Sequence, residues 1–233
     1  MYEIRMDHPA KNALGTELML WMHEQLEAAG DEPLLLTGTG SAFSAGLNLK
    51  ELAGLEDREV EPFVRRVDEI ATRLFLHPAP TVAWINGHAI AGGCVLALCC
   101  DHRVAVEEVR TKIGVNEVAL GVCFPPRILN ICRSRIPRRH HDEVLLGARL
   151  YAPADALRLG LVDEVSSDAE ALARRRLAEL AAIPRRAYAT TKAVLHGEAA
   201  RLDEADERRF REIELPLWRL PEVRQRVLAV LGK

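Results

Sequence analysis

The sequence predicts an α/β core followed by a helical C-terminal region. Short runs of branched apolar residues, typical of buried strands, alternate with longer runs in which apolar residues recur every three to four positions, as in amphipathic helices. The strand-like runs stop after about residue 166, and the remainder is rich in Ala, Leu, Arg and Glu. A chain of 233 residues is long enough to bury a core without disulfides or metals.

The predicted core alternates strands and helices. Strands are expected at residues 34–37, 81–85, 103–106 and 161–165. Two apolar stripes predict helices between them, formed by Leu14, Leu18, Met22 and Leu26 and by Phe63, Val67, Ile70 and Leu74. This alternation indicates an α/β domain with helical crossovers.

The C-terminal region is expected to be helical from residue 167 to residue 233. Pro184, Pro216 and Pro221 divide it into separate helices. Its apolar residues Phe210, Leu215, Leu217 and Trp218 must cover either the core of the same chain or a neighbouring subunit. We therefore expect a core over residues 1–166 and a helical region over 167–233 that closes the site or forms a subunit contact.

The composition excludes several classes of protein. A hydrophobic fraction of 48% with 28% charged residues excludes a disordered chain. A net charge of −3 disfavours nucleic acid or an anionic membrane as the main partner. No run of 18 apolar residues and no signal peptide is evident, so we expect a cytoplasmic protein. Five cysteines without a CxxC pair suggest neither a disulfide framework nor a metal site.

The first unusual segment, residues 34–52, runs from a strand through small residues into a short helix. It fails the GxGxxG pattern because Phe43 occupies the third glycine position, and it fails the P-loop pattern because Leu47 and Asn48 follow Gly46. What remains is a backbone that can approach a ligand closely near Gly46 and that presents free N–H groups where a helix begins, at about Leu47.

A second segment, residues 82–98, repeats the arrangement of strand, glycine turn and helix. Two such helix starts could direct two backbone N–H groups at one oxygen and so form an oxyanion hole. The alternative is that the glycines only permit tight packing between strand and helix.

In a third segment, Glu117 stands among Val115, Val118, Ala119 and Leu120. A carboxyl group in such apolar surroundings has a raised pKa, which suits it to carry protons. The alternative is a glutamate that caps a helix or pairs with an arginine.

These segments together resemble the crotonase superfamily, the enoyl-CoA hydratase and isomerase family, over nearly the whole chain. The matching strings lie at residues 43–49, 86–94, 100–105, 116–121 and 154–162. The resemblance implies a spiral of ββα turns with a C-terminal helical region, assembled as a homotrimer or homohexamer. It also implies that the backbone N–H groups of Leu47 and Gly92 hold the carbonyl oxygen of an acyl-CoA or carrier-protein thioester. No separate cofactor is expected, because coenzyme A is part of the substrate.

The resemblance further implies which reaction to expect. Hydratases of this family use two glutamates to orient water, and here Val95 occupies the first position while Glu117 matches the second. A single glutamate is the pattern of the Δ3,Δ2-enoyl-CoA isomerases, in which Asn116 matches a position that contacts the substrate. By the same resemblance, substrate contacts are expected at Ala45, Asn48, Leu49 and Lys50, with Lys50 a candidate partner for a phosphate.

The sequence thus predicts an enoyl-CoA isomerase in which Glu117 is the only proton shuttle. Two alternatives remain open. One is a hydratase or another lyase, decarboxylase or hydrolase of the same superfamily, since all use the oxyanion hole. The other is a catalytically silent protein that binds thioesters.

Other residues that could carry chemistry are interpreted mainly as structural. Asp101, His102 and Arg103 are neighbours on a strand, so their side chains alternate between faces and cannot converge. His88 is expected to bond the backbone, and Cys94 has no evident basic partner. The basic residues between 133 and 141 fit a solvated helix face better than a site for phosphates.

Overall fold

The computed structural model describes residues 1–232 and contains two parallel β-sheets. The larger sheet has the order β1-β2-β4-β6-β8, with all neighbouring strands parallel. Its strands are β1 (Tyr2–Met6), β2 (Leu34–Gly38), β4 (Thr81–Ile85), β6 (His102–Val106) and β8 (Glu164–Ser166). The smaller sheet has the order β3-β5-β7. Its strands are β3 (Ala42–Ser44), β5 (His88–Ile90) and β7 (Ile113–Gly114).

Helices connect and cover these strands. In chain order they are α1 (Pro9–Asn12), α2 (Thr16–Ala29), α3 (Leu49–Gly54), α4 (Asp57–Phe75), α5 (Gly92–Cys99), the 3₁₀ turn η1 (Glu117–Leu120), α6 (Pro126–Arg135), η2 (Arg138–His140), the π-helical turn η3 (Asp142–Leu146) and α7 (Pro153–Leu159). A strand of the large sheet, a strand of the small sheet and then one or more helices follow one another three times, beginning at β2, β4 and β6. This repeat is the predicted spiral of ββα turns.

Alternation along the strands separates two hydrophobic clusters. Leu34 and Leu36 of β2 face the main core, together with apolar residues of α2, α4, α5 and α6, whereas Leu35 faces the opposite side. There Leu35, Val82 and Val104 pack against α8 (Ala169–Ala181). Both faces of the large sheet are therefore covered, as expected for parallel strands.

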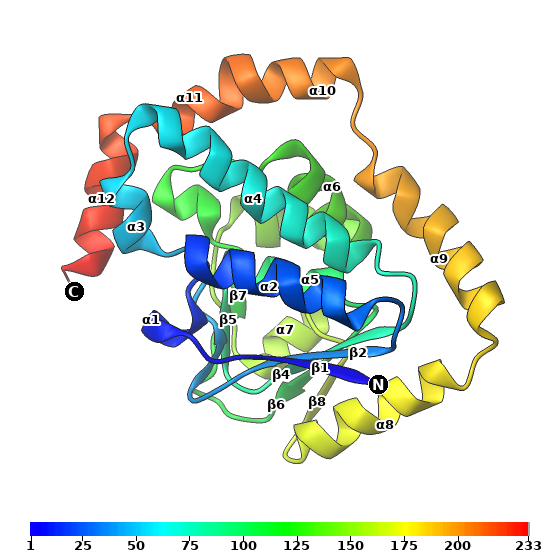
Figure 1. The fold of residues 1–233 in the computed structure, drawn as a ribbon. Coiled ribbons are helices and arrows are strands. Elements are labelled where there is room, and N and C mark those ends of the chain that lie inside the picture. Colours follow the sequence, from blue (N-terminus) through cyan, green and yellow to red (C-terminus); the bar gives the residue numbers. More distant parts are fainter. Residues whose placement is uncertain (233) are drawn as a thin grey trace.

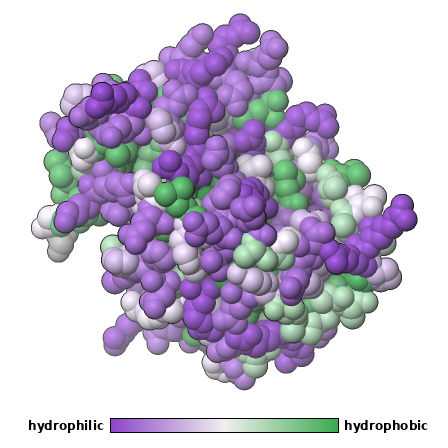
Figure 2. Space-filling model, in the orientation of Figure 1, coloured by the Kyte–Doolittle hydropathy of each residue, from purple (hydrophilic) through white to green (hydrophobic). Residues whose placement is uncertain are grey.

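The C-terminal helices pass around the core (Figure 1). They are α8, α9 (Arg185–Ala200), α10 (Glu204–Arg209), the π-helical turn η4 (Phe210–Glu214), α11 (Leu215–Trp218) and α12 (Pro221–Leu231). Figure 1 shows α8 below the large sheet, α9 along one side, and α12 returning beside α3. Polar side chains dominate the face shown in Figure 2, on which α2, α4 and α9 lie. The prediction of helices after residue 166 is thus confirmed.

The tail packs on the core of its own chain. Phe210, Leu215 and Trp218 are buried in the main hydrophobic cluster. Leu217 is 38% exposed and does not join that cluster. The sequence predicts that these residues cover either the core of the same chain or a neighbouring subunit. For Phe210, Leu215 and Trp218, the structure shows that they cover the core of the same chain.

Several predicted boundaries need correction. The last strand is Glu164–Ser166 and not 161–165, because Leu161 and Val162 pack in the turn that follows α7, where Gly160 ends the helix with a φ of 77°. β1 and the three short strands of the small sheet were not predicted. The helical stripes at residues 14–26 and 63–74 are confirmed by α2 and α4, although Leu14 precedes α2.

Candidate active site

An apolar cavity of about 250 Å³ lies between the two glycine turns, η1 and α12. Its lining residues are Ala45, Leu47, Leu49, Leu52, Ile90, Ala91, Asn116, Glu117, Leu120, Val122, Leu150, Val227 and Val230. Within this lining, Glu117 is the one side chain that can ionise. A mostly apolar cavity with one or two placed polar groups is typical of a small-molecule site.

Glu117 is the first residue of η1, and its side chain is buried, with 6% of the residue exposed. Burial raises the pKa of its carboxyl group to about 8. Its Oε2 atom has no hydrogen-bond partner, and the buried Oδ1 of the preceding Asn116 has none either. Among residues 1–232, no arginine pairs with this carboxyl group, so the alternative of a structural ion pair does not apply. Two residues of the cavity lining therefore each carry a buried polar atom without a hydrogen-bond partner.

The loop after β3 leaves one backbone N–H group free. Ala45 N donates to Lys11 O at 3.0 Å, and Gly46 N donates to Ser44 Oγ at 3.2 Å. Asn48 N donates to Leu14 O at 3.0 Å. Within the described part of the chain, Leu47 N has no hydrogen-bond acceptor, although Gly46 N and Asn48 N each have one. This N–H group is available to a ligand, as expected for an oxyanion donor.

Gly92 begins α5 directly beside this loop. Its N–H group lies in the first turn of the helix, where no intrahelical acceptor exists. A Cβ atom on Gly92 would lie 3.7 Å from Leu47 Cδ2 and 3.9 Å from Gly46 Cα. The preceding Ala91 has a φ of 49°, a strained conformation for a residue other than glycine. The fold thus brings the two predicted donor residues together, and Ala91 holds a strained backbone at their junction.

The structure gathers most, though not all, of the predicted substrate contacts. Ala45, Leu47, Leu49, Asn116 and Glu117 line the cavity, and Gly92 borders it through Ala91. Asn48 caps α3, because its side chain accepts a hydrogen bond from Glu51 N at 3.2 Å. Lys50 is exposed on α3 and does not line the cavity. Asn48 therefore shapes the loop, and Lys50 lies outside the cavity wall.

Val95 stands one turn after Gly92 in α5, where the resemblance expects the first glutamate of a hydratase. Its side chain is buried within the main core and is not part of the cavity lining. No residue of that lining supplies a second carboxylate beside Glu117. The described cavity therefore contains one acid–base group.

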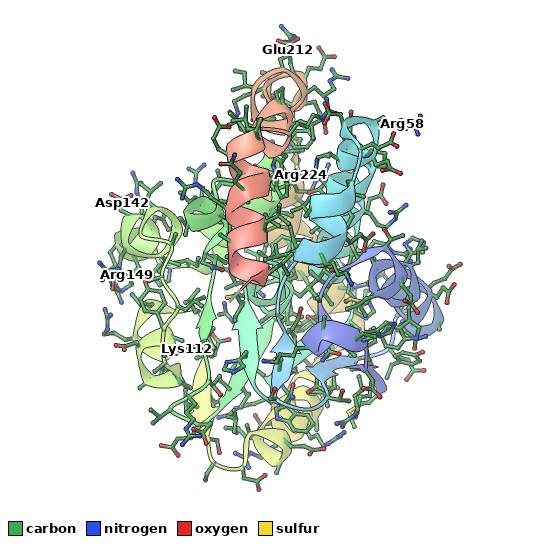
Figure 3. The ribbon with its side chains drawn as sticks, turned by 90° about the vertical axis from the view of Figure 1, so that its left-hand side faces the viewer. Arg58, Lys112, Asp142, Arg149, Glu212 and Arg224 are labelled. Carbon is green, nitrogen blue, oxygen red and sulfur yellow. The ribbon has the colours of Figure 1, made fainter. Side chains whose placement is uncertain are left out.

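Part of the cavity wall comes from α12, which sequence reasoning did not assign to the site. Val227 and Val230 of this helix line the cavity. A Cβ atom on Gly121, whose φ is 84°, would lie 3.4 Å from Val223 Cγ2, so α12 packs on the turn that follows Glu117. Figure 3 shows α12 beside α3, with Arg224 labelled on it and the exposed Lys112 and Arg149 lower on the same face. The spacing of Val223, Val227 and Val230 could have predicted an apolar stripe, but not what it covers.

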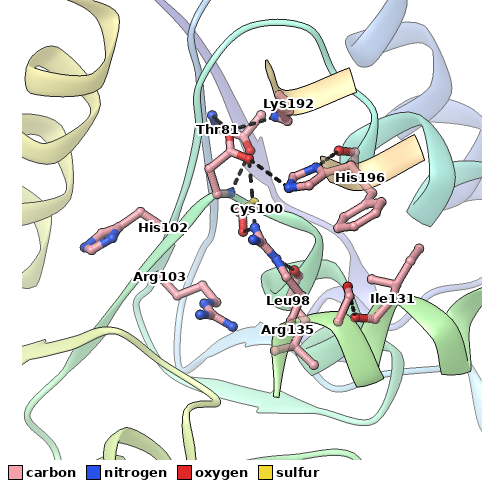
Figure 4. Close-up of polar contacts among 12 residues, drawn as sticks. Thr81, Leu98, Cys100, His102, Arg103, Ile131, Arg135, Lys192 and His196 are labelled. Carbon is pink, nitrogen blue, oxygen red and sulfur yellow. Dashed lines mark hydrogen bonds and ion pairs between the residues drawn. The ribbon is translucent and has the colours of Figure 1, made fainter. Parts of the chain in front are cut away.

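A second and larger cavity, of about 390 Å³, lies under α9 and away from Glu117. At its base, Asp101 Oδ2 accepts hydrogen bonds from Lys192 Nζ at 2.7 Å and from Tyr188 OH at 2.8 Å. Figure 4 shows Lys192, Arg135 and His196 gathered around this point. Arg135 Nε donates to Leu98 O at 2.9 Å, and His196 Nδ1 bonds Phe75 O at 2.8 Å. These polar groups are satisfied within the protein, so this network attaches α9 to the core.

The other candidates have structural partners. His102 pairs with Glu164 at 2.7 Å and Arg103 with Asp163 at 2.6 Å, so the two form no triad with Asp101. His88 Nδ1 accepts a hydrogen bond from Lys112 N at 3.0 Å. Burial raises the pKa of the Cys94 thiol to about 12, which keeps it protonated at neutral pH.

The basic residues of segment 133–141 do not all face solvent. Arg135 turns inward to the carbonyl groups at the end of α5, whereas Arg133, Arg138 and Arg139 are exposed. In residues 1–232, no helix is long and apolar enough to cross a membrane. That part of the chain also contains no group of three or more His, Cys, Asp or Glu side chains arranged to hold a metal ion.

The arrangement of two parallel sheets in ββα turns, with helices wrapped around them, defines the crotonase fold. Human mitochondrial Δ3-Δ2-enoyl-CoA isomerase has the same fold, with a TM-score of 0.87 and 27% identity over 99% of this chain and 92% of that one. The family model described as enoyl-CoA hydratase/isomerase matches residues 1–215. The chain therefore belongs to the enoyl-CoA hydratase/isomerase family.

Relatives with different names are about equally similar to the chain. Enoyl-CoA delta isomerase 1 of Mus musculus is 31% identical over 204 residues, which is 84% of this chain and 71% of that protein. A putative enoyl-CoA hydratase of Thermus thermophilus is 34% identical over 174 residues, which is 71% of this chain and 67% of that protein. Overall similarity thus defines the family, and the choice of reaction depends on the residues in the cavity.

Proposed function

We propose that this protein isomerises Δ3-enoyl thioesters to Δ2-enoyl thioesters, with Glu117 as its only acid–base group. The observation that supports this most strongly is the single carboxyl group, with one unpartnered oxygen, in an apolar cavity beside the free N–H groups of Leu47 and Gly92. The isomerase named among the relatives has the same fold over nearly the whole chain. A bond shift of this kind needs one base and one stabilised oxyanion.

In the proposed reaction the Glu117 carboxylate removes a proton from C2 of the substrate. The C2–H bond breaks, its electron pair delocalises through the double bond and the thioester carbonyl, and the negative charge gathers on the carbonyl oxygen. The N–H groups of Leu47 and Gly92 stabilise that charge, and removal of one such donor typically lowers kcat by about 10²–10³-fold. The protonated Glu117 then returns the proton to C4, which leaves the double bond between C2 and C3.

Hydration is disfavoured by what surrounds Glu117. Addition of water to the double bond needs a polar group that binds the water molecule and points its oxygen at the carbon atom that the water attacks. The described lining offers no second carboxylate, and the residue at the expected position, Val95, is apolar and lies in the core. Val122, Leu120 and Val227 add further apolar surface. The cavity therefore favours proton transfer over hydration.

The experiment compares two substrates with the purified protein. We expect conversion of 3-hexenoyl-CoA to 2-hexenoyl-CoA and slow or undetectable hydration of crotonyl-CoA. Glu117→Gln should abolish isomerisation while an acyl-CoA still binds. Rapid hydration of crotonyl-CoA would support the hydratase alternative. If neither substrate reacts but acyl-CoA binds, the protein is a silent thioester-binding member of the family.

Further parts of the proposal follow from composition and resemblance. The substrate is an acyl-CoA or a carrier-protein thioester, and no separate cofactor or metal takes part. The core over residues 1–166 carries the chemistry, and the region 167–233 closes the site. This region also contributes to a homotrimer or homohexamer, and analytical ultracentrifugation would measure the mass of that assembly. The protein works in the cytoplasm, without nucleic acid or membrane as a partner.

A further inference from the structure

We infer that Ser44 and Asn12 are positioning residues that hold the Leu47 N–H group in the oxyanion hole. Neither side chain lines the cavity, so any effect on the reaction must pass through the loop. Both are buried, Ser44 completely and Asn12 with 1% exposure. The inference rests on the proposed function and adds to it the residues that fix the geometry of one donor.

The first observation is a left-handed turn next to the loop. Ala10, Lys11 and Asn12 have φ values of 55°, 61° and 57°. Three consecutive residues other than glycine rarely adopt this conformation, because the Cβ atom crowds the following carbonyl group. Such strain persists only where the surroundings enforce it, and it is common at functional sites.

Hydrogen bonds between this turn and the loop supply that enforcement. Asn12 Nδ2 donates to Ala42 O at 3.1 Å, and Asn12 Oδ1 accepts from His8 N at 2.8 Å. The carbonyl group of Lys11 accepts from Ala45 N at 3.0 Å. The turn thus forms hydrogen bonds, through both its backbone and the Asn12 side chain, with β3 and with the loop that leads to Leu47.

Ser44 connects the turn to the residue before the donor. Its hydroxyl group donates to Asn12 O at 2.7 Å and accepts from Gly46 N at 3.2 Å. On its other side, a Cβ atom on Gly93 would lie 2.8 Å from Ser44 Cβ, so Ser44 packs against the helix start that carries Gly92. One side chain therefore contacts both Gly46 and Gly93, the chain neighbours of the two proposed donor residues.

These contacts occupy the N–H groups around Leu47 and leave that of Leu47 free. Leu14 N donates to Gly46 O at 2.7 Å and so holds the peptide that carries the Leu47 N–H group. Ser44 holds the peptide before it. If the Ser44 hydroxyl group is removed, Gly46 N loses its acceptor, this preceding peptide can rotate, and the Leu47 N–H group shifts with it. A small misplacement of a catalytic group can lower a rate by up to about 10²-fold. The loss of the Ser44 hydroxyl group should therefore lower kcat, because negative charge develops on the carbonyl oxygen during the reaction. It should not lower the affinity for a ligand that lacks this oxygen.

The test uses Ser44→Ala, with Thr81→Val as the matched control. Thr81 is also completely buried, and its hydroxyl group accepts from Asp101 N at 3.0 Å, outside the cavity. We expect Ser44→Ala to lower kcat for 3-hexenoyl-CoA about 10-fold. The same variant should bind hexyl-CoA, a thioether without the carbonyl oxygen, within about twofold of the unchanged protein. Asn12→Gly, which relieves the strain but removes the side-chain bonds, should also lower kcat, and Thr81→Val should leave it unchanged.

A second readout separates this inference from the proposed function. The ratio of the affinity for hexanoyl-CoA to that for hexyl-CoA measures how much the oxyanion hole contributes to binding of the carbonyl oxygen. This ratio can be measured even if no substrate turns over. Ser44→Ala and Asn12→Gly should lower this ratio, and Thr81→Val should not. An unchanged kcat or affinity ratio in Ser44→Ala, or an equal loss in Thr81→Val, would overturn the positioning role. Absence of turnover in the unchanged protein would overturn only the isomerase proposal.

Discussion

Glu117 owes its proposed chemistry to its surroundings. An exposed glutamate is ionised at neutral pH and is a weak base, whereas burial raises the pKa of this one to about 8. No cation in the cavity lining offsets that effect. A base with a pKa close to the working pH can both take and return a proton, as an isomerase requires.

The pH dependence of the reaction follows from this pKa. Only the ionised carboxylate can remove the C2 proton, so kcat/KM for 3-hexenoyl-CoA should rise about tenfold per pH unit below pH 8 and level off above it. Glu212→Gln, which changes an exposed glutamate outside the cavity lining, should give the same profile. A rate that stays constant between pH 6 and pH 9 would contradict the role of Glu117.

Residues of the candidate site were predictable to different degrees. The unusual apolar setting of Glu117 and the two glycine turns are visible in the sequence, and the resemblance points to Leu47 and Gly92. The positive φ of Ala91 and the contacts of Ser44 are not visible, because they depend on how separate segments meet. The helix-capping role of Asn48 is not visible either, and its predicted contact with the substrate stays a prediction, because its side chain caps α3 and does not line the cavity.

At the scale of elements, α12 is the part of the tail that reaches the cavity. Val227 is buried and Val230 is 46% exposed, and both lie on the side of α12 that closes the cavity. Together with Leu120, they form a wall beyond the carboxyl group of Glu117. A cavity of about 250 Å³ is small for a ligand site, so this wall should limit the length of the acyl chain.

Enlarging residue 230 tests this wall. Val230→Trp should lower kcat/KM for 3-dodecenoyl-CoA on the order of 10-fold more than for 3-hexenoyl-CoA, because the indole ring occupies space for the distal chain. The comparison variant is Val194→Trp on α9, where the valine is 72% exposed and is not part of the lining. Equal effects on the two substrates would show that α12 does not select chain length.

Elements were predictable where one pattern runs long enough. Branched apolar runs marked β2, β4 and β6, and helical stripes marked α2 and α4. The alternation Tyr2-Glu3-Ile4-Arg5-Met6 is the period of a half-buried strand and could have revealed β1. The strands of the small sheet have two or three residues each, which is too short for a period to appear.

At the scale of the molecule, α9 is attached to the core mainly through polar groups. Lys192 and His196 are buried on its inner face, while most of its other residues are exposed. The ion pair between Lys192 and Asp101 has side-chain exposures of only 5% and 11%. Because α9 leads to α10, α11 and α12, this pair links the core to the tail that closes the cavity.

Loss of the Lys192 charge should therefore destabilise the protein. Lys192→Met leaves Asp101 buried with fewer partners, and we expect the free energy of unfolding in urea to fall by about 3–5 kcal/mol. Arg185, also on α9, forms an exposed ion pair with Asp31, which lies between α2 and β2. Arg185→Met should change the free energy of unfolding by less than about 1 kcal/mol. Similar effects of the two substitutions would mean that the Asp101 network does not hold α9.

The central claim is that one buried carboxyl group carries a proton from C2 to C4. The most direct measurement follows 3-hexenoyl-CoA labelled with deuterium at C2, with the position of the label in the product determined by NMR. Because Glu117 is buried in an apolar cavity, a measurable fraction of the 2-hexenoyl-CoA should carry deuterium at C4, and Glu117→Gln should form no product. A product with only solvent hydrogen at C4, or one formed equally fast by Glu117→Gln, would contradict the claim.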